Sequence, residues 1–162
     1  MSAYHNKRAK EIVKTIIYAT LATVDEAGNP LNSPVRYNFD SDMNIYWVSD
    51  KEGQHSKNIR KNGKAFIVIY DSTVPEGQGE GLYLECIASE VNDVEEVKRY
   101  RTIKKGPDWD GPDDFFGDVV RRVYKAVPKR VWVNDAEMDG NVFVRDTKVE
   151  IELETLMNLV SP

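Results

Sequence analysis

Four consecutive residues, Gln54, His55, Ser56 and Lys57, carry the side chains best suited to hold an anion. They follow a glycine-containing loop and open a predicted helix that runs to about Lys61. Unpaired N–H groups and the positive end of the helix dipole make a helix N-terminus a ready anion site. Lys57 adds a positive charge and Ser56 a hydroxyl donor, with the two preceding side chains as supplements. The pattern therefore predicts a phosphate site; the alternative is a solvated helix start with a basic face.

Few other side chains in the sequence are of the types that catalysis requires. Cys86 alternates with apolar residues and is expected to pack as a small hydrophobic group. A single cysteine cannot form a disulfide within the chain, and one cysteine with two histidines excludes a structural zinc site. His55 is a candidate general base. Trp47 and Trp132 are candidates to stack on a planar ring, although aromatic residues on strands more often belong to the core.

The composition is that of an ordinary globular protein with one domain, residues 1–162. Hydrophobic residues make up 41% and charged residues 30%, and the formal net charge is −5. An acidic balance opposes general binding to nucleic acid, which needs a basic face. The longest apolar run, residues 65–70, is too short to span a membrane, and the polar, basic residues 1–10 do not form a secretory signal. We therefore expect a cytoplasmic protein with neither nucleic-acid nor membrane partners.

The first half of the chain predicts a helix followed by several short strands. Residues 2–14 carry an apolar stripe at helical spacing, and residues 18–24, 31–39 and 45–49 have the alternation and turn signals of strands. These three strands are predicted to form an antiparallel meander. Residues 65–70 are apolar on both faces and predict a central strand. Residues 82–91 predict a further strand.

The second half of the chain predicts two more helices and two late strands. Asp93 and Glu96 have the spacing of a capping box at the start of one helix, and residues 113–123 predict the other. Strands are predicted at residues 131–133 and 149–153, on either side of a turn at residues 139–141. The whole predicts a mainly β fold of six or more antiparallel strands with inserted helices. Such short strands avoid exposed edges by closing into a small barrel.

The order of these pieces resembles the pyridoxamine 5′-phosphate oxidase-like, FMN-binding split-barrel family. The resemblance rests on YATLATV at residues 18–24, NSPV at 32–35, IYWVS at 45–49, SKNI at 56–59, GLYLECIA at 81–88 and PKRVW at 128–132. It implies an antiparallel split β-barrel that forms a homodimer, with two FMN sites shared across the subunit interface. Its function would be that of a flavoprotein.

The resemblance also implies roles for particular residues. The polar edge of the isoalloxazine ring would run beside the segment Asn32, Ser33, Pro34 and Val35. The ribityl chain and the ring would be lined by Trp47, Val48 and Ser49. Ser56 and Lys57 match the pair that holds the phosphate, which coincides with the anion site inferred from the residues alone. Trp132 would reach the flavin from the partner subunit.

Several positions depart from the pattern of the true oxidase. Tyr37 stands where the oxidase has a lysine for its substrate, and Asn32 stands where it has an arginine that contacts FMN. No Arg-x-His follows Trp132. We therefore expect an FMN-dependent oxidoreductase acting on a small-molecule substrate or electron donor other than pyridoxamine phosphate, with no catalytic side chain assigned. The alternatives are a non-catalytic flavin-binding or redox-sensing protein, and a split barrel that holds haem or a deazaflavin.

Overall fold

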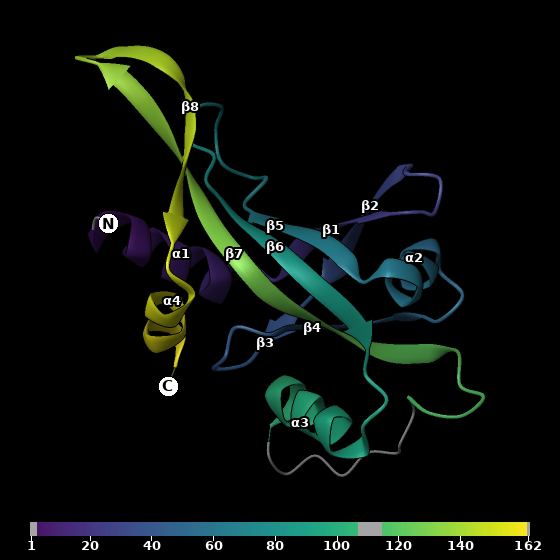
Figure 1. The fold of residues 1–162 in the computed structure, drawn as a ribbon. Helices are drawn as coiled ribbons and strands as arrows, with labels where there is room; N and C mark the ends of the chain where they lie inside the picture. The colour runs from purple at the N-terminus through teal and green to yellow at the C-terminus, as the bar shows by residue number, and fades with distance from the viewer. Residues whose placement is uncertain (1–2, 107–114, 162) are drawn as a thin grey trace.

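The computed structural model describes residues 3–106 and 115–161, which contain one antiparallel sheet of eight strands and four helices (Figure 1). The strands follow the order β2-β1-β5-β6-β7-β4-β3, and β8 pairs with β7. The elements are α1 (Ala3–Thr15), β1 (Tyr18–Val24), β2 (Pro30–Arg36), β3 (Asn38–Phe39), β4 (Ile45–Asp50), α2 (Gln54–Asn62), β5 (Lys64–Tyr70), β6 (Gly81–Glu90), α3 (Val94–Lys105), β7 (Arg121–Asp139), β8 (Val142–Ile151) and α4 (Leu153–Val160). The mainly β, antiparallel split-barrel fold expected from the sequence is confirmed.

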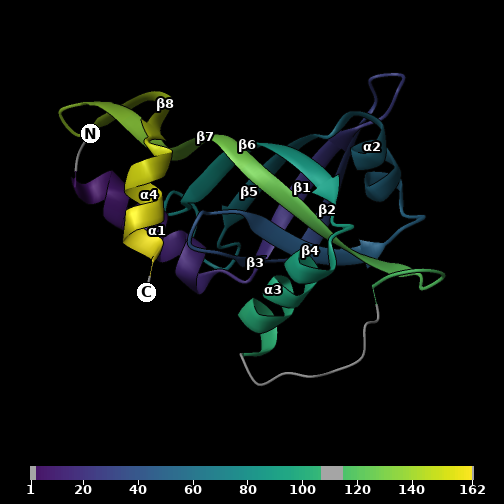
Figure 2. The same ribbon diagram turned by 60° about the horizontal axis from the view of Figure 1, so that its bottom comes forward.

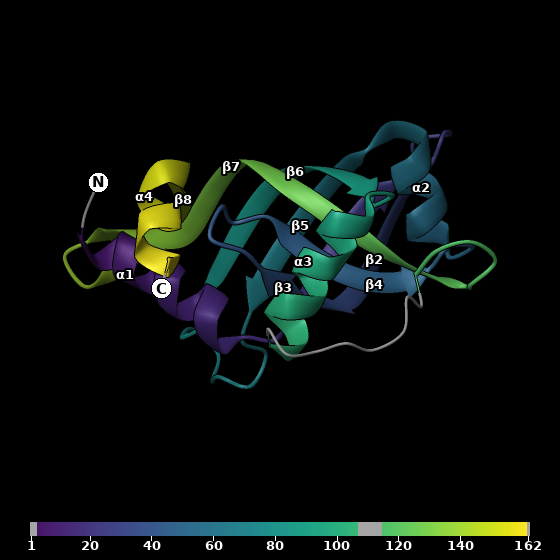
Figure 3. The same ribbon diagram turned by 90° about the horizontal axis from the view of Figure 1, so that it is seen from below.

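The sheet curls around an apolar core because alternate residues of each strand face inward. In β6 the inward row is Leu82, Leu84, Cys86 and Ala88, all buried, while Glu85 and Ile87 are exposed. The same alternation in β1, β5 and β7 fills the core with aliphatic side chains such as Leu21, Ile67 and Val131. The sheet therefore has an inner face that forms the core and an outer face that none of the described helices covers along β5 and β6 (Figure 1). Figure 3 shows α3 beside the other part of the sheet, near β3 and β4.

The helices close the ends of the curled sheet. Helices α1 and α4 lie side by side at one end, and α2 lies at the other end beside β1 (Figure 2). Helix α1 buries Ala9, Ile12 and Val13, in agreement with the predicted apolar stripe. Helix α4 was not predicted, because its first residue, Leu153, continues the alternation of the preceding strand. None of the helices in the described ranges is long and apolar enough to cross a membrane.

The predicted three-strand meander is wrong in its second strand. Residues 31–39 do not form one strand: β2 ends at Arg36, Tyr37 leaves the sheet, and the short β3 pairs only with β4. The Tyr37 hydroxyl donates to the carbonyl oxygen of Ile16, 2.7 Å away, and the Tyr37 N–H donates to Ile17. Because these bonds turn the chain toward α1, β2 pairs with β1 alone and β4 pairs with β3 and β7. The gap between β2 and β4 is the split in the barrel.

The predicted helix at residues 113–123 is also wrong. Residues 113 and 114 lie outside the described ranges, residues 115–120 form turns, and Arg121 already begins β7. The segment's valines prefer strands, and Val123 is buried where β7 pairs with β4, opposite Val48. Strand β7 is 19 residues long and accommodates Pro128 at a register shift opposite Glu85 and Cys86.

Other local predictions are confirmed. Strand β1 has the predicted bounds, and the Asp93 carboxylate caps α3 by accepting a hydrogen bond from the Glu96 N–H. Helix α2 ends at Asn62, within one residue of the predicted end at Lys61, because Gly63 adopts the left-handed conformation. The turn between β7 and β8 lies at Gly140 and Asn141. These features depend on interactions between residues that are close together in the sequence, so local sequence patterns predict them.

We predict that Gly63→Ala lowers the free energy of unfolding more than Gly77→Ala does. Both glycines have φ near +70 to +80°, but a Cβ on Gly63 would lie 3.2 Å from the carbonyl oxygen of Ala88, whereas a Cβ on Gly77 meets nothing within 4 Å. We expect losses of about 2 and about 1 kcal/mol, respectively, in urea unfolding. Equal losses would show that the contact between the end of α2 and β6 contributes no stability.

Candidate functional site

The start of α2 has the geometry of an anion site, although the Glu52 carboxylate already contacts its lysine. Gly53 is the N-cap and provides no side-chain cap, and the first N–H of the helix with a partner inside it is that of Lys57. The buried Ser56 hydroxyl donates to the Asp50 carbonyl oxygen at 2.7 Å, so its oxygen remains available only as an acceptor. The Lys57 ammonium lies 3.5 Å from the Glu52 carboxylate and is about half exposed. A bound phosphate would therefore compete with Glu52 for Lys57.

The first two residues of α2 differ in their hydrogen bonds. The Gln54 side-chain amide donates to Asn58, one turn further along the helix. The His55 ring is half-buried, and its Nε2 atom is buried without a hydrogen-bond partner among the described residues. Burial lowers the pKa of the His55 imidazole, and the Asp50 carboxylate opposes this by a smaller amount. His55 therefore favours the neutral imidazole, which has one free lone pair.

Polar side chains that the sequence analysis did not single out fix α2 against the sheet. The Asn58 side-chain amide donates to Thr23 at 3.1 Å, and the Asn62 amide donates to the carbonyl oxygen of Val24. Arg60 forms an ion pair with Glu90, 3.2 Å away, on β6. The sequence gives little indication of these contacts, because an asparagine on a helix is usually exposed to solvent. Burial of Asn58 shows that this one positions the helix.

The alternation of β2 divides the predicted segment 32–35 between the two faces of the sheet. Asn32 and Pro34 pair with Ala22 and Thr20 on the outer face. Ser33 and Val35 point inward, and Val35 belongs to the core. Only Asn32 and Pro34 therefore present their side chains to a ligand on the outer face.

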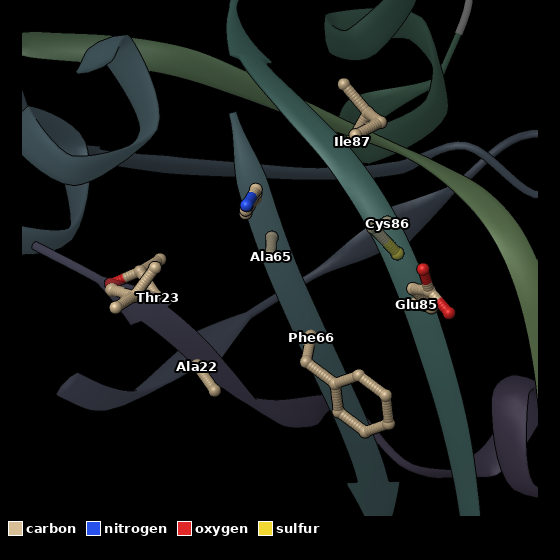
Figure 4. A pocket seen from close by; sticks show the side chains of 9 residues that line it. Ala22, Thr23, Ala65, Phe66, Glu85, Cys86 and Ile87 are labelled. Carbon is tan, nitrogen blue, oxygen red and sulfur yellow. The ribbon is translucent and has the colours of Figure 1, made fainter. Parts of the chain in front are cut away.

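An apolar groove of about 500 Å³ crosses the outer face over β1, β5 and β6, and we call it the outer groove (Figure 4). Its side chains include Ala22, Phe66, Glu85 and Ile87. Ala22 is the cross-strand neighbour of Asn32, and the ring of Phe66 stacks on Trp132 with centroids 6.3 Å apart. The groove is thus flanked by predicted residues on two sides, Asn32 on β2 and Trp132 on β7.

Cys86 lies beneath this groove but is not poised for chemistry. Its side chain points into the core and is 2% exposed. Burial raises the pKa of the thiol to about 12, so the reactive thiolate is disfavoured at neutral pH. Cys86 is a packing residue.

A second cavity, of about 750 Å³, lies where the split in the barrel meets α3, and we call it the basic cleft. Val48 and Ser49 line it, as do three cationic residues from different elements: Arg36 at the end of β2, Lys104 on α3 and Arg121 at the start of β7. Burial lowers the pKa of Lys104, and Lys105, Arg36 and Arg121 lower it further by repulsion. The cleft therefore has an excess of positive charge, with three cationic side chains against the single carboxylate of Asp50.

Trp47, in contrast, lies inside the barrel. It is fully buried and stacks on Tyr124, with ring centroids 5.8 Å apart and an angle of 19° between the planes. Its Nε1 atom is buried without a hydrogen-bond partner among the described residues. In this arrangement Trp47 supports β4 and β7 from within and does not line the outer groove or the basic cleft.

Of the twelve predicted residues, Ser33, Val35 and Trp47 point into the barrel, and the other nine fall into three groups. Gln54, His55, Ser56 and Lys57 share the start of α2; Asn32, Pro34 and Trp132 share the outer face; and Val48 and Ser49 share the basic cleft. Phe66, Arg36 and Lys104 could not be recognised as site residues from the sequence, because their positions in the groove and the cleft depend on strand order. Within the described ranges, no group of three or more His, Cys, Asp or Glu side chains could hold a metal ion.

Solved structures share this fold at low sequence identity. A haem-binding protein from Mycobacterium smegmatis aligns with a TM-score of 0.67 and 17% identity, over 98% of this chain and 61% of that one. HutZ, the haem storage protein of Vibrio cholerae, aligns with a TM-score of 0.57 and 16% identity, over 78% and 92%. A candidate pyridoxamine 5′-phosphate oxidase from Listeria innocua aligns with a TM-score of 0.58 and 18% identity, over 79% and 96%.

The sequence comparison identifies the family. Among curated proteins, none matches the chain significantly in sequence. The family profile described as pyridoxamine 5′-phosphate oxidase, however, matches residues 6–132. This range includes strands β1 to β6 and the first part of β7, up to Trp132. The chain belongs to the pyridoxamine 5′-phosphate oxidase family.

Proposed function

We propose that this protein binds FMN and acts as an oxidoreductase on a small molecule. The observation that carries the proposal is the outer groove, whose apolar floor lies between Asn32 and Trp132. The family resemblance independently assigns both residues to the flavin. FMN would supply the electron transfer when bound, and the protein would supply binding, orientation and access.

The residues present fit the chemical character of FMN. A flat, largely apolar ring system favours an apolar floor with aromatic neighbours, which Phe66, Ile87 and Trp132 supply. A phosphate favours the start of α2, where unpaired N–H groups and Lys57 lie. Asn58, the residue after Lys57, donates to Thr23, which lines the groove. The phosphate site is thus held beside one end of the ring site.

Tyr37 argues against pyridoxamine phosphate oxidase activity itself. It stands where the resemblance places a substrate lysine, and it is 4% exposed. Its hydroxyl is engaged by the carbonyl oxygens at the end of α1, at 2.7 Å from Ile16 and 3.1 Å from Val13. Burial also raises the pKa of Tyr37, so no charge forms there. We therefore infer a different small-molecule substrate.

Activity, as opposed to flavin storage or redox sensing, requires turnover. Both functions need the same groove, so they differ only in whether a reductant and an acceptor exchange electrons there. Oxidation of reduced nicotinamide by the FMN-loaded protein, faster than by free FMN, supports the oxidoreductase. A rate equal to that of free FMN supports the non-catalytic flavoprotein.

Lys57→Ala is expected to weaken FMN binding about tenfold at low salt while leaving riboflavin binding unchanged. Only FMN carries the phosphate, and losing one charge-assisted contact costs on the order of 1.5 kcal/mol. Fluorescence titration of both ligands measures the difference. Lys61→Ala is the matched control, since Lys61 lies on the same helix and also pairs with a glutamate, Glu26, but at the opposite end from the unpaired N–H groups. Unchanged FMN affinity in Lys57→Ala would place the phosphate elsewhere.

Haem is the second candidate ligand, and His55 is the observation that favours it. Neutral imidazole is the common axial ligand of haem iron, and the buried Nε2 atom of His55 is free of partners among the described residues. The other histidine, His5, bonds to Asp135 at 2.9 Å. Two of the structural neighbours are named for haem. Titrating haemin into the wild type and into His55→Ala distinguishes the two ligands. A Soret band that appears in the wild type and is lost in His55→Ala would favour haem over FMN.

The stability of the protein should fall as the pH drops below about 6.5, and His55→Gln should reduce this loss. The folded-state pKa of His55 is depressed, so below the ordinary histidine pKa the unfolded chain binds more protons than the native one. The native state then loses stability as the pH falls. Urea unfolding of the wild type and of His55→Gln, each at about pH 7.5 and about pH 5.5, measures the effect. An identical loss in both would show that His55 is not the group responsible.

The outer face also supports a homodimer, in which a second copy covers the groove. Tyr18, Tyr70 and Ile87 are 55%, 44% and 50% exposed there, a concentration of large apolar side chains that favours an interface. The family resemblance implies that Trp132 of each subunit then contacts the flavin of the other. A dimer would complete two symmetric sites.

Light scattering at micromolar concentration should give the mass of two chains for the wild type and a larger share of monomer for Ile87→Lys. A buried ammonium facing its symmetry mate would oppose association. Val94→Lys is the control, because Val94 is similarly exposed at 44% but lies on α3, away from the outer groove. A monomeric wild type would overturn the shared-site arrangement.

A further inference from the structure

The end of the β7–β8 hairpin, residues 135–147, projects beyond the rest of the sheet as a two-stranded ribbon, and we call it the arm (Figure 1). Every residue from 136 to 146 is exposed. A ribbon of two strands with neither face covered is only marginally stable in water by itself. The arm therefore has the properties of an element that a further contact stabilises.

Large apolar side chains are concentrated at the end of the arm. Met138 and Phe143 lie directly opposite each other in the register and are 51% and 56% exposed. Val142 and Val144 are also at least half exposed. Of the thirteen exposed large hydrophobic residues among those described, four thus fall within the seven residues 138–144. Such a concentration favours an interface.

One face of the arm continues the outer face of the sheet. Met138 is six residues beyond Trp132 on β7, and alternate residues of a strand share a face. Met138 and its cross-strand neighbour Phe143 therefore lie on the same side as Trp132, about 20 Å further along the strand. On β8 the Lys148 ammonium lies 4.0 Å from the ring centroid of Tyr83, so this strand also contributes to the outer face.

The charges of the arm oppose a membrane or a nucleic acid as its partner. Its ionisable side chains are four carboxylates and one cation: Asp135, Glu137, Asp139, Asp146 and Arg145. A negatively charged ribbon is repelled by anionic lipids and by phosphate backbones. Asp135 pairs with His5 and Glu137 with Arg145, whereas no described cation lies within ion-pair distance of Asp146. The arm therefore fits a surface that is apolar and carries a positive charge.

The outer face of the sheet has such a surface at the end nearest α2. Lys64 and Ile87 are direct cross-strand neighbours on β5 and β6, and both line the outer groove. Ile87 is 50% exposed, and Lys64 is exposed with no described carboxylate within ion-pair distance. An exposed isoleucine beside an unpaired ammonium complements the apolar pair and the unpaired Asp146 carboxylate of the arm.

These two surfaces lie at equal distances from Trp132. Trp132 lies opposite Tyr83 in the register of β6 and β7. Asp146 pairs with the residue four positions beyond Trp132 along the arm, and Ile87 lies four positions from Tyr83 in the opposite direction. A two-fold axis near Trp132 that runs across the strands therefore places the arm of one copy over Lys64 and Ile87 of the other, and the contact is made twice.

We propose that the arm of each copy docks on the outer face of a second copy of this chain. Asp146 pairs with Lys64 of the partner subunit, and Met138 and Phe143 pack beside the partner's Ile87. The arm then closes the end of the partner's outer groove that lies nearest α2, so each groove contains residues of both chains. This inference rests on the homodimer proposed above and does not depend on the flavin.

The test is the dimer dissociation constant, measured by sedimentation at low salt. Asp146→Lys and Lys64→Glu are each expected to raise this constant about tenfold, because each replaces two symmetric attractions with two repulsions. The double variant Asp146→Lys/Lys64→Glu restores the pair with its charges exchanged. Its dissociation constant should return to within about threefold of the wild type, since the two residues are coupled.

Asp139→Lys is the matched control. Asp139 is also an exposed carboxylate with no described cation within ion-pair distance, but alternation puts it on the opposite face of the arm from Met138. The control changes the net charge by the same amount as Asp146→Lys and should leave the dissociation constant unchanged. An equal loss in Asp139→Lys and Asp146→Lys would show that only the overall charge matters, and would overturn the proposal.

A second measurement tests the contact directly. Asp146→Cys/Lys64→Cys should form a covalent dimer when it is oxidised with copper phenanthroline. Neither single cysteine variant should do so, because the native Cys86 is 2% exposed and copies of one introduced cysteine lie far apart in this arrangement. A double variant that sediments as a dimer but is not trapped would overturn the contact.

The outcomes for the dimer, the arm and the flavin can be distinguished. A wild type that sediments as a monomer would overturn both the homodimer and the docking of the arm. A dimer that is insensitive to Asp146→Lys and Lys64→Glu would overturn the docking of the arm alone. FMN titration of the wild type reports on the flavin separately, and failure to bind FMN would overturn the proposed function while the arm contact stands.

Discussion

The hydrogen bonds of Tyr37 to the end of α1 are the constraint on which the open side of this barrel depends. The buried hydroxyl lies 2.7 Å from the carbonyl oxygen of Ile16, and the Tyr37 N–H is bonded to Ile17. These contacts draw the chain out of the sheet between β2 and β3. Strand β4 then finds its partners in β3 and β7, and the barrel stays open between β2 and β4. The basic cleft occupies this opening.

The two faces of the curled sheet differ in character. The inner face is an apolar core, while the outer face of β1, β5 and β6 carries exposed aromatic and aliphatic side chains such as Tyr18, Tyr70 and Ile87. Helix α2 is fixed at one end of this face by Asn58 and Arg60. The ring site and the phosphate site proposed for FMN thus have separate physical origins: strand alternation for one and helix docking for the other.

Charge is distributed unevenly over these surfaces. Buried or half-buried ion pairs satisfy the cations that hold elements together, such as Arg122 with Glu90 and Lys125 with Glu96. The cations of the basic cleft have no carboxylate within ion-pair distance among the described residues, and burial together with their mutual repulsion lowers the pKa of Lys104. Like charges held close together cost stability, so these residues are not there to hold elements together.

The sequence by itself determined the family and those local elements that depend on short-range patterns. Alternation, capping and turn chemistry act within a few residues, so the bounds of β1, the cap at Asp93 and the end of α2 at Gly63 could be predicted. Tertiary structure decided the pairing of β4, the strand at residues 121–123 and the side of the sheet to which Ser33, Val35 and Trp47 point. It alone brought Arg36, Lys104 and Arg121 together. Contacts between residues so far apart depend on strand order and on buried hydrogen bonds such as those of Tyr37, which local patterns do not encode.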